Sequence, residues 1–170
     1  MVNFYRLFIK NCARISRPLT QLTGNAPFTW DNQRQKAFEY LEKALCIAPG
    51  LRTFDPKLPI SVTTDASGFA IGAVLEQDEH GSRRPVAYFS RTMNPNEQNY
   101  HAQEQEPLAI VEALRHWRSY IHGKPCLVQT DHTSLQYLTT QDHLTPLQVR
   151  WLERLIDFYF KIVHISGMTN

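Results

Sequence analysis

The period of the apolar pattern changes near residue 59, and this change limits the fold more than any other feature of the sequence. Earlier in the chain, Phe38, Leu41 and Leu45 recur at helical spacing. Later, residues 60–64 alternate and are rich in β-branched side chains, which is typical of a strand. The first fifty residues are therefore expected to be helical, with a sheet after them.

The helical part is expected to contain two helices. A first pattern, which includes Phe4 and Leu7, is interrupted at Pro18. Asp31 is expected to cap a second helix that ends before Pro49.

The remaining chain predicts a mixed sheet. The predicted strands are 60–64, 69–75, 84–89, 127–130 and 160–165. The predicted helices are 106–121, which Gly123 ends, 134–138, and one that Thr145 caps. Short glycine-containing links suit antiparallel pairing of the first three strands. The order predicts an α/β fold, a mixed five-stranded sheet with helices on both faces.

Composition excludes few classes of protein. The 170 residues carry a net charge of +2, which permits a nucleic-acid partner without arguing for one. Cys12, Cys46 and Cys126 include no CxxC pair, which disfavours a disulfide framework or a zinc site. Cys126 is expected in the core. Without a long apolar stretch or a signal-like start, the protein is expected to be soluble and intracellular, cytoplasmic or nuclear.

Two carboxylates follow predicted strands, where aspartate is uncommon. Asp65 ends the first strand and Asp131 ends the fourth. If these strands are neighbours, the two carboxylates share one coordination shell and need a cation or a proton. Glu106, at the predicted start of a helix, is the natural third ligand, and such a set suits Mg²⁺. Each acid alone could equally be a cap or a solvated residue.

Motifs along nearly the whole chain resemble the end of a Ty3/gypsy-type retrotransposon reverse transcriptase. They include Asn-Phe-Tyr-Arg-Leu-Phe-Ile at 3–9, Arg-Pro-Leu-Thr at 17–20, Thr-Asp-Ala-Ser at 64–67, Ile-Gly-Ala-Val-Leu at 71–75, Pro-Val-Ala-Tyr-Phe-Ser-Arg at 85–91, Glu-Gln-Glu at 104–106, and Thr-Asp-His-Thr-Ser-Leu at 130–135. The resemblance implies a ribonuclease H-like domain at 54–170, preceded by a thumb and connection segment at 1–53.

The resemblance also implies the site residues and the cofactor. Asp65, Glu106 and Asp131 match the first three catalytic, metal-binding carboxylates of the family. Glu104 competes with Glu106, which is preferred because it directly precedes the apolar helix. Pro107 departs from the usual leucine, and the first helical turn is expected to tolerate it. Two Mg²⁺ ions are implied, with Mn²⁺ as a substitute.

The implied activity is metal-dependent hydrolysis of RNA in RNA·DNA hybrids, recognised by 2′-hydroxyls and shape. The family has a fourth carboxylate after a Gly-x-x-Asn turn, and the sequence reaches that turn at 167–170 and stops. The fragment is therefore expected to be weak or inactive, and no polymerase activity is expected without the palm. The rest of a polyprotein is the expected protein partner, in a virus-like particle for an intact element.

Substrate contacts are expected from basic side chains. Arg115, Arg118 and Lys124 are candidates for phosphate binding, although a solvated helix face explains them equally well. His132 is a further candidate, against the alternative of a polar strand-end residue. The competing function is a non-catalytic, domesticated ribonuclease H-like domain that binds or interacts without cleaving. The three intact carboxylates argue against a long period of neutral sequence decay. The absence of the fourth carboxylate from the sequence argues against full nuclease activity.

Overall fold

A computed structural model describes residues 9–23, 27–47, 51–131 and 144–165. The helices are α2 (Cys12–Thr20), the short 3₁₀ helix η2 (Gln21–Thr23), α3 (Asn32–Ile47), α4 (Pro95–Gln98), α5 (Ala102–His116), α6 (Arg118–Ile121) and α8 (Pro146–Leu155). The strands are β1 (Ile60–Ser67), β2 (Ala70–Glu79), β3 (Ser82–Thr92), β4 (Pro125–Thr130) and β5 (Tyr159–His164). All five predicted strands are present.

The strands form one sheet in the order β3-β2-β1-β4-β5. β1, β2 and β3 pair antiparallel, whereas β4 pairs parallel with both β1 and β5. The first strand in the sequence is therefore the central strand of the sheet. This topology confirms the predicted mixed five-stranded sheet.

The β2–β3 hairpin is longer than its sequence pattern predicted. His80 and Gly81 connect the strands with φ of 55° and 82°, the left-handed values that a tight two-residue hairpin turn requires. Asp78 Oδ1 accepts a hydrogen bond from the Gly81 N–H at 2.8 Å. Because the turn needs only two residues, pairing extends through polar positions that the prediction assigned to the link.

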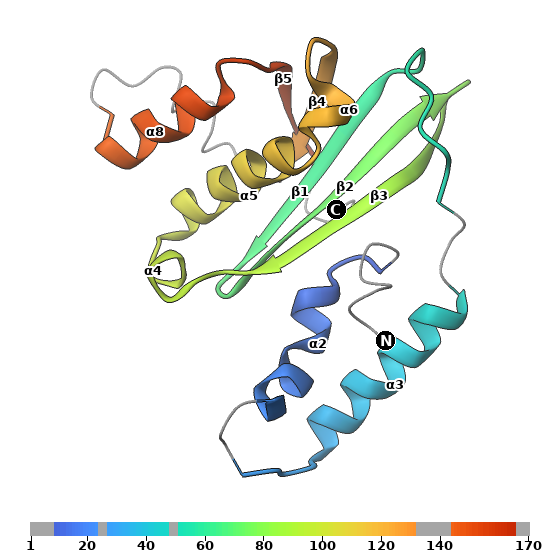
Figure 1. Ribbon diagram of the computed structural model, residues 1–170, viewed down its shortest axis with the longest axis vertical. Coiled ribbons are helices and arrows are strands. Elements are labelled where there is room, and N and C mark those ends of the chain that lie inside the picture. Colours follow the sequence, from blue (N-terminus) through green and yellow to red (C-terminus); the bar gives the residue numbers. More distant parts are fainter. Residues whose placement is uncertain (1–8, 24–26, 48–50, 132–143, 166–170) are drawn as a thin grey trace.

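One face of the sheet packs against α5, α6 and α8 and contains the main core (Figure 1). Ile110, Leu114, Trp117 and Ile121 are each at most 2% exposed, as their shared helical face predicted. Cys126 on β4 is buried in the same core, and burial raises the pKa of its thiol to about 12. The expected core role of Cys126 is thus confirmed.

The opposite face packs against the N-terminal helices, with α2 against β2 and β3 (Figure 1). Between α2 and α3 lies a small separate core of Ile9, Cys12 and Leu41. Phe38 was expected on the buried face of α3, but it is 50% exposed and packs edge-on against Trp30. Helices therefore cover both faces of the sheet, as predicted.

Local capping signals predicted several helix ends correctly. Thr145 Oγ1 accepts a hydrogen bond from Gln148 N–H, and Gln148 Oε1 accepts one from Thr145 N–H. Asp31 Oδ1 accepts a bond from the Arg34 N–H at the start of α3. Gly123, with φ of 74°, follows the end of α6.

Two prolines disagree with the predicted helices. Pro18 was expected to interrupt the first helix, yet α2 continues through it to Thr20. Pro107 was expected in a first helical turn, yet α5 begins at Ala102 and contains Pro107 in its second turn. A proline removes one intrahelical hydrogen bond, and the surrounding packing outweighs that local cost here.

The predicted helix at 106–121 is two helices. α5 starts four residues earlier than predicted, because Glu104 Oε2 accepts a hydrogen bond from the His101 N–H in the manner of a capping box. The helix breaks at Trp117, and α6 resumes at Arg118.

The predicted helix at 134–138 and the Gly-x-x-Asn turn at 167–170 lie outside the described residues, as do Phe4 and Leu7. No helix in the described part of the chain is both long and apolar enough to cross a membrane.

Candidate metal and nuclease site

Asp65 and Asp131 lie side by side on neighbouring strands. Asp65 is two residues from the end of β1, and Asp131 directly follows β4. β1 and β4 are parallel, with Thr63 opposite Gln129. Asp65 and Asp131 each follow this last pair by two residues, so they lie at the same end of the two strands. The predicted juxtaposition of the two strand ends is therefore present.

Glu106 reaches the same place from α5. It is the fifth residue of the helix and not its first, which corrects the expectation that the helix dipole favours it there. Its side chain is 6% exposed and accepts a hydrogen bond from the Ala66 N–H, next to Asp65. Glu104, its competitor for the role, is engaged at the helix start through His101.

The three carboxylates repel one another. Burial raises the pKa of Glu106 to about 7, with further upward contributions from Asp131 and then Asp65. Burial also raises the pKa of Asp65, and Asp131 raises it further, while Arg14, Lys10 and a hydrogen bond from Asn11 oppose the shift. Mutual repulsion of this kind requires that the three charges share one small region of the molecule.

Two of these carboxylates have an oxygen that is buried without a partner. Glu106 Oε2 and Asp131 Oδ1 make no hydrogen bond to any described residue. A buried carboxylate oxygen without a donor is costly, and a bound cation is one way to satisfy it. The donor set, three carboxylates with two orphaned oxygens, thus fits a hard divalent cation.

The carboxylates are neighbours without forming a closed coordination shell. Within the described ranges, no three Asp, Glu, His or Cys side chains converge closely enough to hold a metal ion as they stand.

His164 is a neighbour of Asp131 on the adjacent strand β5. His164, at the end of β5, places Nε2 2.8 Å from the Asp131 backbone carbonyl. A carbonyl oxygen only accepts hydrogen bonds, so this contact selects the Nε2–H tautomer of the ring. His164 thereby fixes the backbone that carries Asp131, and only the β4–β5 register could have indicated it.

The candidate basic residues do not form a single cluster. Arg115 pairs with Glu112 at 3.0 Å, and Arg118 pairs with Asp157 at 2.9 Å. Lys124 Nζ lies 4.9 Å from the centre of the Phe54 ring. His132 lies outside the described residues. Their contact with a substrate stays a prediction.

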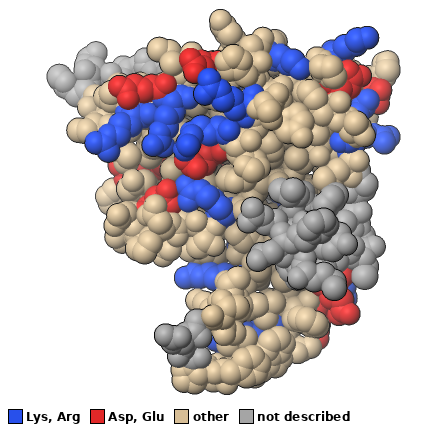
Figure 2. Space-filling view, viewed as in Figure 1, with Lys and Arg blue, Asp and Glu red and all other residues tan. Residues whose placement is uncertain are grey.

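Basic and acidic side chains are interleaved on the face shown in Figure 2, at the upper left, where Figure 1 draws α5 and α8. Glu112 is at the centre of this group, with Arg115 at 3.0 Å, Arg91 at 3.5 Å and Arg154 at 3.8 Å. Arg91 also pairs with Glu97 at 2.7 Å. Much of the positive charge here is already neutralised within the protein.

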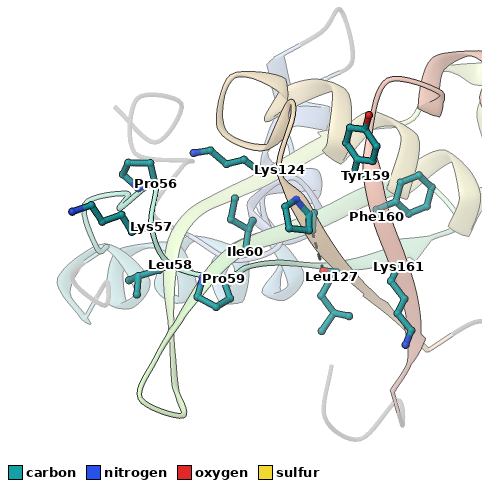
Figure 3. A pocket seen from close by; sticks show the side chains of 12 residues that line it. Pro56, Lys57, Leu58, Pro59, Ile60, Lys124, Leu127, Tyr159, Phe160 and Lys161 are labelled. Atoms are coloured by element: carbon teal, nitrogen blue, oxygen red, sulfur yellow. Dashed lines mark hydrogen bonds between the residues drawn. The ribbon is translucent and has the colours of Figure 1, made fainter.

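A cavity of about 730 Å³ lies at the other end of the parallel strands. Figure 3 shows its lining, which comes mainly from the starts of β1, β4 and β5. Lys124 borders this cavity, seven residues before Asp131, or roughly 20 Å along an extended strand. The carboxylate site is therefore separate from the cavity.

Comparison with known proteins identifies the family. The profile described as "RNase H-like domain found in reverse transcriptase" matches residues 55–158, more than half of the sequence. The chain therefore belongs to the family of RNase H-like domains found in reverse transcriptases.

Similar proteins agree with this assignment. The chain is 40% identical to the retrovirus-related Pol polyprotein from transposon 412 of Drosophila melanogaster, over 99% of this chain and 14% of the polyprotein. It is 34% identical to that from transposon opus of the same organism, over 100% of this chain and 18% of the polyprotein. The chain thus spans less than a fifth of these relatives. The resemblance to Ty3/gypsy-type reverse transcriptases is confirmed.

The fold also matches solved structures. The foamy viral protease-reverse transcriptase in complex with double-stranded DNA superimposes with a TM-score of 0.78, over 98% of this chain and 30% of that one, at 24% identity. The foamy viral protease-reverse transcriptase in complex with an RNA/DNA hybrid superimposes with a TM-score of 0.72, over 98% of this chain and 24% of that one, also at 24% identity. These matches confirm the fold.

Proposed function

We propose that this domain is a metal-dependent nuclease that hydrolyses the RNA strand of RNA·DNA hybrids. The observation that carries the proposal is that Asp65, Glu106 and Asp131 are close enough to act on one another electrostatically, with buried, unpartnered oxygens on the last two. The foamy viral relative in fold was solved with an RNA/DNA hybrid, which supports the choice of substrate.

The three carboxylates would hold the metal, with Asp65 in the central position. Two Mg²⁺ ions, or Mn²⁺ in their place, would supply an activated water and stabilise the leaving oxygen of the scissile phosphate. Glu106 and Asp131 would each contribute the oxygen that has no protein donor. Their mutual repulsion favours cation binding, because binding relieves it.

The chain's own residues shape the site around these ligands. His164 holds the Asp131 backbone, and the Ala66 N–H orients Glu106. Hybrid phosphates would meet basic side chains, among which Arg115, Arg118, Lys124 and His132 stay candidates. In related proteins the domain is one part of a larger polyprotein, so the rest of a reverse transcriptase is the proposed partner.

The test is cleavage of a labelled RNA·DNA hybrid with Mg²⁺ or Mn²⁺, compared between the parent and Asp65→Asn. Cleavage by the parent alone is the expected result. Cleavage by both would remove Asp65 from the mechanism. A folded parent that binds the hybrid without cleaving it would instead favour the non-catalytic binding domain.

A further inference from the structure

One row of residues crosses three strands on the sheet face that α2 covers. Asp65 of β1 pairs with Gly72 of β2, and Gly72 pairs with Ser90 of β3. Side chains of directly paired residues in antiparallel strands point to the same face. The row therefore places a carboxylate, a position without a side chain and a hydroxyl next to one another.

The start of α2 docks on this row. The Ala13 N–H, one of the first-turn donors that a helix leaves unpaired, donates to Ser90 Oγ at 3.0 Å. Asn11 lies over Gly72, so closely that a Cβ at position 72 would collide with Asn11 Oδ1. Glycine at 72 therefore creates the space in which the Asn11 side chain sits, directly beside Asp65.

Asn11 has an unusual conformation for its position. It precedes α2 with φ of 54° and ψ of 31°, left-handed values that asparagine adopts more readily than most non-glycine residues. An asparagine before a helix commonly caps it, yet the Asn11 side chain makes no cap hydrogen bond. Instead the side chain lies over Gly72, directly opposite Asp65, where hydrogen bonding by Asn11 lowers the pKa of that carboxyl and opposes the effect of burial. The side chain of Asn11 is therefore directed toward Asp65 and does not cap the start of α2.

Contacts on either side hold Asn11 in place. Ile9 and Cys12 are 3% and 4% exposed in the small core with α3. Farther along α2, the Arg17 guanidinium lies 3.8 Å from the centre of the Phe69 ring, in the β1–β2 link. Asn11 is therefore fixed by the N-terminal segment and by the sheet together.

The charge of the N-terminal segment suits this position. The first 30 residues contain four basic residues, Arg6, Lys10, Arg14 and Arg17, and no Asp or Glu. The other 140 residues contain 14 Lys or Arg and 16 Asp or Glu. Lys10 and Arg14 are close enough to Asp65 to act on it electrostatically. The segment thus brings positive charge close to Asp65.

We infer that Asn11 is a positioning residue for the metal site: it holds the Asp65 carboxylate in its metal-binding orientation, through the gap that Gly72 leaves. This inference rests on the proposed function, because it takes Asp65 to be a metal ligand. In this inference, the N-terminal helical segment supports the proposed metal site by orienting one of its ligands. Mutation of a residue that orients a metal ligand commonly weakens metal affinity 10–100-fold, so a loss of about tenfold is expected here.

The experiment measures the Mn²⁺ dissociation constant of the 170-residue chain by isothermal titration calorimetry, beside its unfolding midpoint. Asn11→Ala removes the hydrogen bond, and Gly72→Ala displaces Asn11 by filling its space. Each is expected to weaken Mn²⁺ binding about tenfold. The double variant is expected to be no weaker than Asn11→Ala alone, because both changes remove one contact. Gly68→Ala is the matched control, since a Cβ at Gly68 would meet nothing within 4 Å.

Unchanged or tighter Mn²⁺ binding by folded Asn11→Ala would overturn the inference, as would additive losses in the double variant. Weakening by the Gly68→Ala control would also overturn it, because the effect would then be general to the hairpin. Asp65→Asn separates the two proposals. If it binds Mn²⁺ as the parent does, the metal assignment itself fails. If it loses binding while Asn11→Ala does not, only the positioning role fails.

Discussion

The parallel strands β1, β4 and β5 have chemically opposite ends. Where β1 and β4 end, Asp65 and Asp131 meet Glu106, and buried polar oxygens lack donors. Where these strands begin, residues such as Ile60 and Leu127 line a largely apolar cavity of about 730 Å³ (Figure 3). This cavity is therefore at the end of the strands that lacks the three carboxylates, so it does not mark the candidate metal site.

The largest effect is expected at the carboxylate end, from Asp65→Asn. Hybrid cleavage should fall by about 10³-fold or more, because a central metal ligand is lost. Stability should not fall, because burial and Asp131 already disfavour the charged form of Asp65. Single-turnover cleavage and thermal unfolding measure the two effects. If Asp65→Asn lost activity only because it unfolded, the result would not support a chemical role for the carboxylate end of the sheet.

The pH dependence of stability is the second prediction, and it depends on Glu106. Its pKa is raised from 4.5 to about 7 in the folded protein, so the fold favours the protonated acid. Without metal, stability should fall as the pH rises from about 4.5 through 7, by up to about 3 kcal/mol at 1.4 kcal/mol per pKa unit. Urea unfolding at pH 5 and pH 8 measures the change.

Glu106→Gln provides the control for this pH dependence. The variant should flatten the dependence between pH 5 and pH 8, because no carboxyl titrates at position 106. Adding Mg²⁺ to the parent should restore part of the stability lost at pH 8. A parent whose stability is unchanged between the two pH values would contradict the raised pKa.

At the cavity end, a core change should affect stability alone. Ile60→Ala removes a side chain that is 5% exposed and borders the cavity, so it should cost about 2–4 kcal/mol of unfolding free energy. The Mn²⁺ affinity of the folded variant should match that of the parent. Chemical denaturation and calorimetry test the two halves of this prediction, and a loss of Mn²⁺ affinity would show that the two ends are coupled.

The smallest effect is expected from Lys124→Ala. If Lys124 contacts a substrate phosphate, hybrid binding should weaken less than tenfold, and the salt dependence of binding should fall by about one unit. The cleavage rate at saturation should not change, because Lys124 is far from Asp131 along β4. Lys57→Ala, on the same cavity, is the matched control. Equal effects of both changes would indicate a general charge effect.

Sequence rules succeeded where the cause was local. The Thr145-Pro146 start of α8 and the Asp31 cap depend on residues within one helical turn, and both were predicted. Asp65 and Asp131 could be paired because parallel strands end at one edge of a sheet. The start of α5 was missed, because His101 is not a usual capping residue and its partner Glu104 was weighed only as a metal ligand.

The remaining features depend on contacts between distant parts of the chain. Asn11 and Gly72 are 61 positions apart, and His164 and Asp131 are 33 apart. No periodic pattern reports such contacts. The one available signal was a glycine inside a strand, which often marks a close approach of another group. Pro18 and Pro107 likewise remain in helices because tertiary packing outweighs local preference.

The central place of β1 in the sheet also orders the assembly of the domain. β1, β2 and β3 are joined by tight turns, so the pairing of these three strands closes only short loops. The pairing of β1 with β4 closes a far longer loop, since Thr63 pairs with Gln129, which lies much later in the sequence. The pairing that positions Asp65 is thus expected to form before the pairing that brings Asp131 next to it. The three carboxylates are therefore brought together only by this long-range pairing, and the proposed cleavage is expected only once β4 is docked.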